Sequence, residues 1–374
     1  MLEHETTKTI KAMARCWTGR SSLHSVSTVS NAAPAKRSPQ VRGRGMATAT
    51  VHALSTGSLT LPERFFIHPS DPDAKKQCPS MSFLIQHHST DSKITRIVFD
   101  LGLRRDITLY PSALEKHIQS RHPFTTEPDA IASLAAGNLK PQDIDFIILS
   151  HVHYDHVGYP KDFSSTNPNL KFLVGPGALD LLAGRTKRDI GSHMVFEPDL
   201  LPLDRTIELP PPPISPLDAT KPPPPASELS LDTPLITTWS RVPLAPFEHT
   251  IDLFGDGAIY LLNAPGHLPG HVNLLVRISS SPLKFVLLAG DAAHDIRLFD
   301  GTHDIATWTD DQGRSCCIHW DVAQAKETIG RIARVKREGV EVDGQRAEVE
   351  VVFAHDWAWE AKAKERARFF PGQL

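Results

Sequence analysis

The sequence lacks several features that would place it in a specialised class. Its 374 residues include only four cysteines, which is too few for a disulfide framework. No apolar run approaches the roughly 18 residues that a transmembrane helix needs. Neither sign of charge dominates, because the formal net charge is −3. We therefore expect no membrane and no nucleic-acid partner, since proteins that bind polyanions usually present a basic face.

The N-terminal segment 1–56 is predicted to be a disordered extension rather than part of the folded domain. It is rich in Ser, Thr, Lys and Arg, and it lacks the apolar core of a secretory signal. Residues 1–45 could act as a mitochondrial transit peptide, although Glu3 and Glu5 argue against this because such peptides avoid acids. A tail without a function is an equally good interpretation. We expect a cytoplasmic location, with a mitochondrial one as the alternative.

Residues 57–374 are predicted to form one folded domain. Strands at 81–86 and 94–100 are expected to form a hairpin, and a strand at 170–174 precedes a helix at 178–183. This succession of strand and helix favours a layered α/β fold. The proline-rich stretch 209–234 is interpreted as a surface insertion, with a ligand for a proline-binding module as the alternative.

The strongest chemical signal is the stretch from His151 to His156, which follows the apolar run 144–149. Such a run predicts a buried strand. His151 and His153 are two residues apart, so their side chains point to the same side of an extended chain. Asp155 and His156 would lie in the turn that follows. Imidazole nitrogens and a carboxylate around one volume suit a metal such as zinc. A polar loop that happens to contain histidines is the alternative.

This pattern resembles the HxHxDH signature of the metallo-β-lactamase superfamily. The segment 264–271, Ala-Pro-Gly-His-Leu-Pro-Gly-His, resembles a later motif, in which His267 corresponds to a metal ligand and His271 to a supporting position. An apolar strand that ends in Asp291 resembles a third motif, and His355 after the last strand resembles the final ligand. The resemblance implies an α/β fold with four layers, an αββα sandwich, and the proline-rich stretch as a surface insertion.

The resemblance also implies a site for two divalent metal ions, most typically Zn²⁺. Three protein ligands and a bridge leave each ion an open position, which indicates a catalytic site. The chemistry implied is hydrolysis of an ester-like carbonyl by a hydroxide that two metals share, with Asp155 also able to relay a proton to the leaving oxygen. The implied ligands are His151, His153 and His267 for one ion, Asp155, His156 and His355 for the other, and Asp291 as the bridge.

Within the superfamily, the order of these motifs is most similar to the N-acyl-homoserine lactone lactonases, which implies a small-molecule lactone or similar ester as the substrate. One position departs from that pattern. Those lactonases have an oxyanion-stabilising tyrosine three residues after the bridging aspartate, and here this position is His294. A neutral imidazole can donate one hydrogen bond, so His294 is a candidate catalytic residue. The alternatives are a glyoxalase-II-like thioesterase and a non-catalytic metal-binding or interaction protein.

Charged residues after the strand at 94–100 supply two further hypotheses. By resemblance, Asp100 would lie near the metal site and orient a ligand histidine, whereas an aspartate that merely ends a strand in a turn is nearly as good an interpretation. Arg104 and Arg105 could meet an anionic part of a substrate, although solvated arginines are more common.

Overall fold

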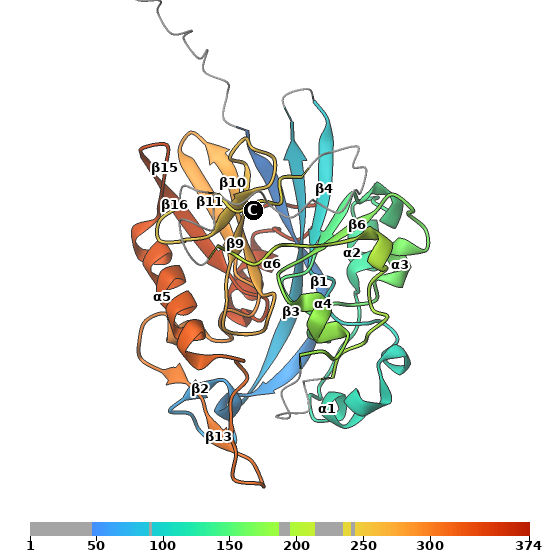
Figure 1. Ribbon diagram of the computed structural model, residues 1–374, viewed down its shortest axis with the longest axis vertical. Helices are drawn as coiled ribbons and strands as arrows, with labels where there is room; N and C mark the ends of the chain where they lie inside the picture. The colour runs from blue at the N-terminus through green and yellow to red at the C-terminus, as the bar shows by residue number, and fades with distance from the viewer. Residues whose placement is uncertain (1–46, 90–91, 187–194, 214–234, 241–243) are drawn as a thin grey trace, which may run out of the picture. The chain divides into compact units, whose positions relative to one another are not determined.

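The computed structural model describes residues 47–89, 92–186, 195–213, 235–240 and 244–374. All of them lie within one compact unit, Gly45–Leu374. Two six-stranded sheets face each other, and helices cover the outer face of each (Figure 1). The predicted αββα sandwich is therefore confirmed. In the described part of the chain, no helix is both long enough and apolar enough to cross a bilayer.

The first sheet has the strand order β1-β3-β4-β5-β6-β7. The hairpin predicted around residues 87–93 is present, because β3 and β4 pair antiparallel from Phe83 opposite Phe99 to His88 opposite Ile94. From β4 onwards the neighbouring strands run parallel. The strands are β1 (Ala49–Pro62), β3 (Lys75–His88), β4 (Ile94–Phe99), β5 (Phe146–Ile148), β6 (Lys171–Val174) and β7 (Thr206–Glu208).

The second sheet has the order β15-β16-β11-β10-β9-β8, in which only β11 and β16 pair in parallel. Its strands are β8 (Thr250–Asp252), β9 (Ile259–Asn263), β10 (Val272–Ser280), β11 (Leu283–Leu288), β15 (Val340–Val342) and β16 (Gln345–Val352). Two small ribbons lie outside the main sheets: β2 (Ile67–His68) pairs with β12 (Asp304–Ile305), and β13 (Trp308–Thr309) pairs with β14 (Ser315–Cys316).

Three of the helices, α2, α5 and α6, begin where the sequence supplies an aspartate cap. Asp321 accepts a hydrogen bond from the backbone N–H of Gln324 at the start of α5, and Asp129 and Asp356 cap α2 and α6 in the same way. These oxygens satisfy amide groups that the first helical turn leaves unpaired. The helices are α1 (Glu115–Gln119), α2 (Ala130–Ala135), α3 (Lys161–Ser164), α4 (Ala178–Leu182), α5 (Val322–Glu338) and α6 (Trp357–Glu365).

Three apolar cores hold the four layers together. The central core lies between the sheets and joins side chains such as Phe99 and Leu274. A second core packs the buried stripe of α5, including Ile332, against the outer face of β11 and its neighbours. A third packs α2, α3 and α4 against the first sheet. Each sheet is therefore buried on both faces, which explains why its parallel strands read as continuous apolar runs rather than alternating ones.

The direction of the strands gathers the polar motifs at one edge. β4 and β5 run parallel, as do β11 and β16, so the carboxyl ends of each pair emerge together. β9 and β11 are both antiparallel to β10 and therefore also run in the same direction. We call the segments that leave these five carboxyl ends the ligand edge, namely 100–104, 149–158, 264–271, 289–294 and 353–356. Open α/β sheets place their sites at this end of their strands.

The fold starts earlier than residue 57, because β1 begins at Ala49 and pairs with β3 from Ala49 opposite His87. Gly57 and the serines around it interrupt the apolar pattern and conceal this strand in the sequence. The rest of the predicted extension, residues 1–46, lies outside the described residues. So do residues 214–234 of the proposed insertion. Of its described start, Leu209 is buried in the central core and the carbonyl of Pro210 accepts a hydrogen bond from Trp239.

Candidate metal centre

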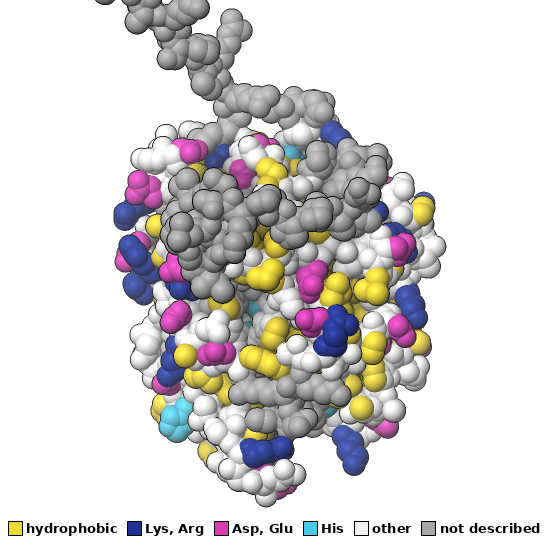
Figure 2. Space-filling view, viewed as in Figure 1, with side chains coloured by type: hydrophobic (Ala, Val, Ile, Leu, Met, Phe, Trp, Pro, Cys, Tyr) yellow, Lys and Arg dark blue, Asp and Glu magenta, His cyan; other side chains and the backbone are white. Residues whose placement is uncertain are grey.

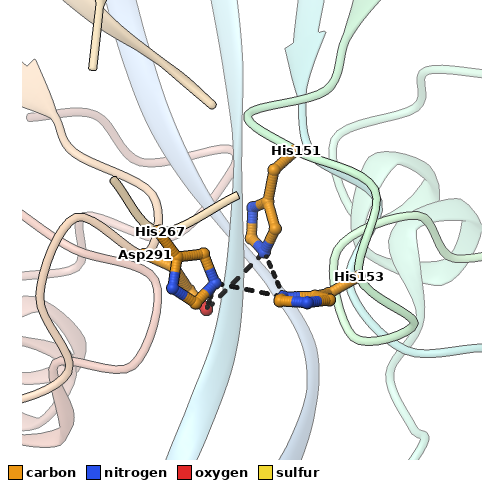
Figure 3. Close-up of side chains that lie close together, drawn as sticks. All are labelled: His151, His153, His267 and Asp291. Atoms are coloured by element: carbon orange, nitrogen blue, oxygen red, sulfur yellow. Dashed lines mark hydrogen bonds and ion pairs between the residues drawn. The ribbon is translucent and has the colours of Figure 1, made fainter. Parts of the chain in front are cut away.

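The side chains of the first predicted ligand set converge at the ligand edge (Figure 3). His151 Nε2 lies 2.9 Å from His153 Nδ1, and His267 Nε2 lies 3.0 Å from the same atom. Asp291 Oδ2 lies 3.5 Å from His267 Nε2 and 3.8 Å from His151 Nε2. Four potential donor atoms from three separate loops therefore surround one small volume.

A second cluster lies on the other side of Asp291. Its second oxygen, Oδ1, lies 3.2 Å from His156 Nε2 and 3.3 Å from His355 Nε2. Asp155 Oδ2 completes this group at 3.7 Å from His355 Nε2. Asp291 thus presents one carboxylate oxygen to each cluster, which is the arrangement that a bridging carboxylate requires. The structure brings together all seven side chains that the sequence proposed as ligands.

Hydrogen bonds to the far sides of the rings set which nitrogen faces the centre. His156 Nδ1 donates to Asp100 Oδ2 at 2.9 Å, and His355 Nδ1 donates to the Pro79 carbonyl at 2.7 Å. The hydroxyl of Ser150 donates to Asp100, so it is left to accept from His151 Nδ1 at 3.0 Å. With each Nδ1 carrying a proton, each Nε2 turns a lone pair towards the clusters, as metal-binding histidines do.

Asp100 therefore orients a histidine, as the resemblance implied. Its side chain also accepts from the Ser150 N–H at 2.7 Å. The residue is buried and has a backbone φ of 63°, a conformation that costs free energy for a residue other than glycine. The neighbouring hydrogen bonds hold it there, so this strained position serves the orientation of the ligand edge.

His271 has both ring nitrogens engaged within the protein. Its Nδ1 donates to the Ala264 carbonyl at 3.0 Å, and its Nε2 accepts from the Asp291 N–H at 3.0 Å. The supporting position proposed for it agrees with these contacts. The same loop approaches α5 closely at Gly266, where φ is 126° and an added Cβ would lie 2.2 Å from the backbone nitrogen of Ala325. Only glycine fits at that position.

Burial and the neighbouring charged groups shift the pKa values of several side chains in the two clusters. Burial, followed by the neighbouring histidines, holds the pKa of His151 and His267 well below the ordinary value. Burial alone would lower the pKa of His156 as well, but the carboxylates of Asp291 and Asp100 raise it well above that value. Burial would raise the pKa of Asp291, yet the surrounding imidazoles lower it strongly. These shifts favour neutral rings at His151 and His267, an imidazolium at His156 and an ionised carboxylate at Asp291, and a divalent cation would displace the proton of His156.

These groups fit divalent cations. His156 Nε2 and Asp291 Oδ1 are buried and have no hydrogen-bond partner of suitable geometry among the described residues, although they face each other. A buried polar atom without a partner costs roughly 1–3 kcal/mol. Coordination of a cation would remove this cost at both atoms. The mixture of imidazole and carboxylate donors is one that zinc and similar metals accept.

His294 was proposed as a catalytic residue and not as a metal ligand, and it lies beside Asp291, the proposed bridge. Its Nε2 is 2.9 Å from Asp291 Oδ2, and its ring is nearly parallel to that of His355 at a centroid distance of 5.5 Å. It lines the small cavity over the two clusters, together with Phe66 and Ile318. The candidate catalytic histidine is thus within reach of a substrate bound there.

His319 is a residue of the site that the sequence did not reveal. Its nitrogens lie near those of His267 and His294, within a group whose potential donor atoms are all within 4.8 Å of one another. Burial first, and then His294, lower the pKa of His319 to about 3, so the ring is neutral. It stands alone between Ile318 and Trp320 in the sequence, and no motif signals it.

The two arginines suspected of contacting a substrate do not face the cavity. Arg104 is buried, donates to the Gly158 carbonyl and forms an ion pair with Glu197. Arg105 pairs with Asp129 at 3.0 Å. Both guanidinium groups have acidic partners and neither lines the cavity, so the structure gives the substrate-contacting interpretation no support. Arg121, which the sequence did not single out, lines the cavity instead.

Comparison with known proteins agrees with this geometry. A sequence model described as the metallo-beta-lactamase superfamily matches residues 77–301, which is more than half of the chain. A Penicillium brevicompactum protein named cytochrome P450 monooxygenase mpaDE is 26% identical over 341 residues, which cover 87% of this chain and 35% of that protein. The chain thus spans about a third of this relative. The gamma-lactamase FDB1 of Fusarium pseudograminearum is 29% identical over 68% of this chain and 56% of its own length.

Solved structures show the same fold. A B. thuringiensis AiiA variant with N-decanoyl-L-homoserine bound at its active site superposes with a TM-score of 0.53 and 17% sequence identity. The match covers 88% of this chain and the whole of the other. At this identity the likeness establishes the arrangement of the layers and nothing more.

Proposed function

This chain belongs to the metallo-β-lactamase superfamily, and we propose that it is a hydrolase that opens a lactone or similar small ester at a site for two divalent metal ions. The observation that carries the proposal is the orientation of Asp291, whose two oxygens face two separate groups of nitrogen donors. A structural metal site would use a closed set of ligands around one ion, whereas this arrangement suits a pair of ions with open positions.

In this proposal His151, His153 and His267 hold one ion, and Asp155, His156 and His355 hold the other, with Asp291 shared. Two divalent ions, most typically Zn²⁺, would supply a nucleophile at neutral pH by lowering the pKa of water to about 7, and would polarise the carbonyl of the substrate. The protein keeps the donors in place through the contacts of Asp100, Ser150 and Pro79 with the rings.

Two side chains have further proposed roles in the reaction. The Asp155 carboxylate lies in the cavity, where it can carry a proton to the leaving oxygen. The Nε2–H of His294 donates to Asp291 Oδ2 in the structure, and it would turn to the oxygen of the attacked carbonyl once that carboxylate oxygen binds a cation. Phe66, Leu61 and Ile318 form the apolar part of the lining of the same cavity.

The names of several relatives support a substrate with a cyclic acyl bond. One is the gamma-lactamase of Fusarium pseudograminearum, and another is an N-acyl homoserine lactonase of Azorhizobium caulinodans, which is 26% identical over 44% of this chain and 48% of its own length. Lactams and lactones react through the same kind of tetrahedral oxyanion, which a metal or hydrogen-bond donor stabilises.

The test is a hydrolysis screen of the metal-loaded protein. N-acyl homoserine lactones, simple γ-lactones and aryl esters would be compared with a glutathione thioester, with metal content measured by elemental analysis. Hydrolysis of lactones or esters is expected. Preference for the thioester would replace the proposal by a glyoxalase-II-like activity, and a metal-bound protein that hydrolyses none of them would point to a non-catalytic role.

Two variants test whether the activity depends on the two clusters. His153→Ala should lose both metal and hydrolysis, because its Nδ1 lies within 3.0 Å of two other proposed ligand nitrogens. His88→Ala removes an exposed histidine at the end of β3 and serves as the matched control. Unchanged metal content in His153→Ala would contradict the assigned cluster.

A further inference from the structure

A second depression continues from the cavity over the clusters. It has a volume of about 680 Å³ and shares His117, Arg121 and Ile318 with that cavity. We call it the anion groove. It runs between α1 and the ribbon β13–β14, which lie at the same end of the sheets (Figure 1). A molecule bound at the clusters can therefore extend into it without a change in the backbone.

The charges of the anion groove are all of one sign. Arg64, Lys75 and Arg121 line it, and none of the described residues that line it is an aspartate or a glutamate. The protein as a whole has a slight excess of acid. Over the described surface in Figure 2, basic and acidic side chains are interspersed. With three cations and no acid among its described residues, the groove differs from its surroundings, and it favours an anionic ligand.

Arg121 stands at the point where the groove meets the cavity, and the fold holds its side chain in place. Its Nε donates to His117 Nε2 at 3.4 Å, and it lines the cavity together with Tyr154, the residue between the proposed ligands His153 and Asp155. Among the described residues, no carboxylate forms an ion pair with it, whereas Arg104 and Arg105 both have such partners. A fixed guanidinium with spare donors suits a carboxylate group.

Part of the remaining lining of the groove is apolar, namely Pro62, Phe65, Trp308 and Ile318, and His117, Gln119, Ser120 and His122 supply polar groups beside it. Phe65 and Trp308 pack against each other at a centroid distance of 4.8 Å, and the guanidinium of Arg64 lies 4.7 Å from the Phe65 ring. A ligand for this groove would thus combine an apolar body with a negative charge. Burial against flat aromatic faces would supply affinity, and the cations would select the charge.

We propose that the anion groove binds a carboxylate-bearing arm of the substrate, so that the preferred substrate is an acidic ester or lactone rather than a neutral one. This inference rests on the proposed hydrolase function and specifies its substrate class. Arg121 is the residue that selects the charge, Arg64 and Lys75 add to the field, and Phe65 and Trp308 contact the body of the arm.

The experiment compares two chromogenic esters that differ in one charge, 4-nitrophenyl hydrogen glutarate and its neutral methyl ester. The ratio of their KM values is measured for the metal-loaded protein and for Arg121→Gln. The wild type should have the lower KM for the acidic ester, and Arg121→Gln should shift the ratio by about tenfold towards the neutral one, since hydrogen bonds between charged groups are the stronger kind. Arg121→Lys keeps the charge and should restore part of the preference.

Arg337→Gln is the matched control, because it removes one exposed arginine from α5 without changing the groove. An equal KM ratio in the wild type, Arg121→Gln and Arg337→Gln would overturn the inference while leaving the hydrolase intact. If neither ester is hydrolysed, the lactone screen described above still decides the proposed function. Calorimetric binding of 3-phenylpropanoate and of its neutral amide then still decides the inference: a preference for the anion that Arg121→Gln abolishes supports it, and equal binding contradicts it.

Discussion

The ligand edge and the anion groove are built in different ways, although the cavity over the ligand edge shares Arg121, His117 and Ile318 with the groove. At the ligand edge, short motifs follow directly after buried strands, and the polar side chains are buried and engaged with one another. In the groove, cations from separate segments stand exposed or half-exposed on an apolar wall.

The difference follows from what each region has to do. A cluster that binds metal needs donor atoms fixed within a few tenths of an ångström, and the carboxyl ends of buried parallel strands provide that rigidity. A groove that selects charge needs only a local excess of positive potential and a surface to pack against. We therefore expect substitutions at the edge to have large effects on metal and rate, and substitutions in the groove to have smaller effects on substrate preference.

The largest effect is expected at the bridge. Asp291→Asn removes the negative charge that both clusters share and should lower kcat/KM for any substrate by at least about 10³-fold, comparable to or beyond the loss of a strong electrostatic contact in an active site. Elemental analysis should show less bound metal. Asp252→Asn, at the end of β8, where the carboxylate accepts from the Gly257 N–H, is the control. If Asp291→Asn keeps the metal content and the kcat/KM of the wild type, the expectation that substitutions at the ligand edge have the larger effects is wrong.

Asp100→Asn should have an intermediate effect. The amide keeps the size of the side chain but weakens acceptance from His156 Nδ1, so we expect metal affinity to fall about 10–100-fold. Competition with a chromogenic chelator measures this. Asp145→Asn is the matched control, because that carboxylate accepts from the Arg96 N–H at the opposite end of β5. If both variants bind metal as the wild type does, Asp100 has no orienting role.

In the groove, Trp308→Ala should raise KM about fivefold for a substrate whose arm has an apolar body and a carboxylate. The substitution would remove roughly 40 Å² of apolar contact, which is worth about 1 kcal/mol. Metal content should stay that of the wild type, since the indole packs on Phe65 rather than on a proposed ligand. Steady-state kinetics and elemental analysis on one preparation check both. A loss of metal would show that the two regions are not separable.

The smallest effect is expected from salt. The Debye length falls from about 10 Å at 0.1 M to about 3 Å at 1 M, so the groove cations are screened while the buried clusters are not. KM for an acidic ester should rise about two- to threefold over this range, with kcat unchanged. The neutral ester provides the reference. A fall in kcat for both esters would place the salt effect at the metal centre instead.

The ligand edge could be predicted from the sequence because its information is local. His151 to His156 and the loop containing His267 are contiguous motifs, and each follows a strand that its apolar residues reveal. The hairpin of β3 and β4, and the helix α5 with its aspartate cap, were recognisable for the same reason. Strand order was not readable, since pairing between distant segments leaves no local signal.

The groove could not be predicted, because nothing in the chain connects its members before it folds. Arg64 and Lys75 flank the ribbon strand β2, Arg121 follows α1, and Trp308 begins β13. The sequence drew attention to Arg104 and Arg105, which follow a strand at the ligand edge, whereas folding gives both an acidic partner. Whether an arginine is available to a ligand depends on those tertiary partners. His319 was missed for the same reason.

The two histidines of the loop 264–271 differ in what could replace them. His271 joins the backbone of Asp291 to that of Ala264 by accepting one hydrogen bond and donating another. The side chain of glutamine also has an acceptor and a donor, so glutamine could make the same two hydrogen bonds at this position. Under the proposed function no such exchange is open to His267, because its nitrogen would itself be a metal ligand. Of the two histidines in this loop, therefore, only one is a proposed metal ligand.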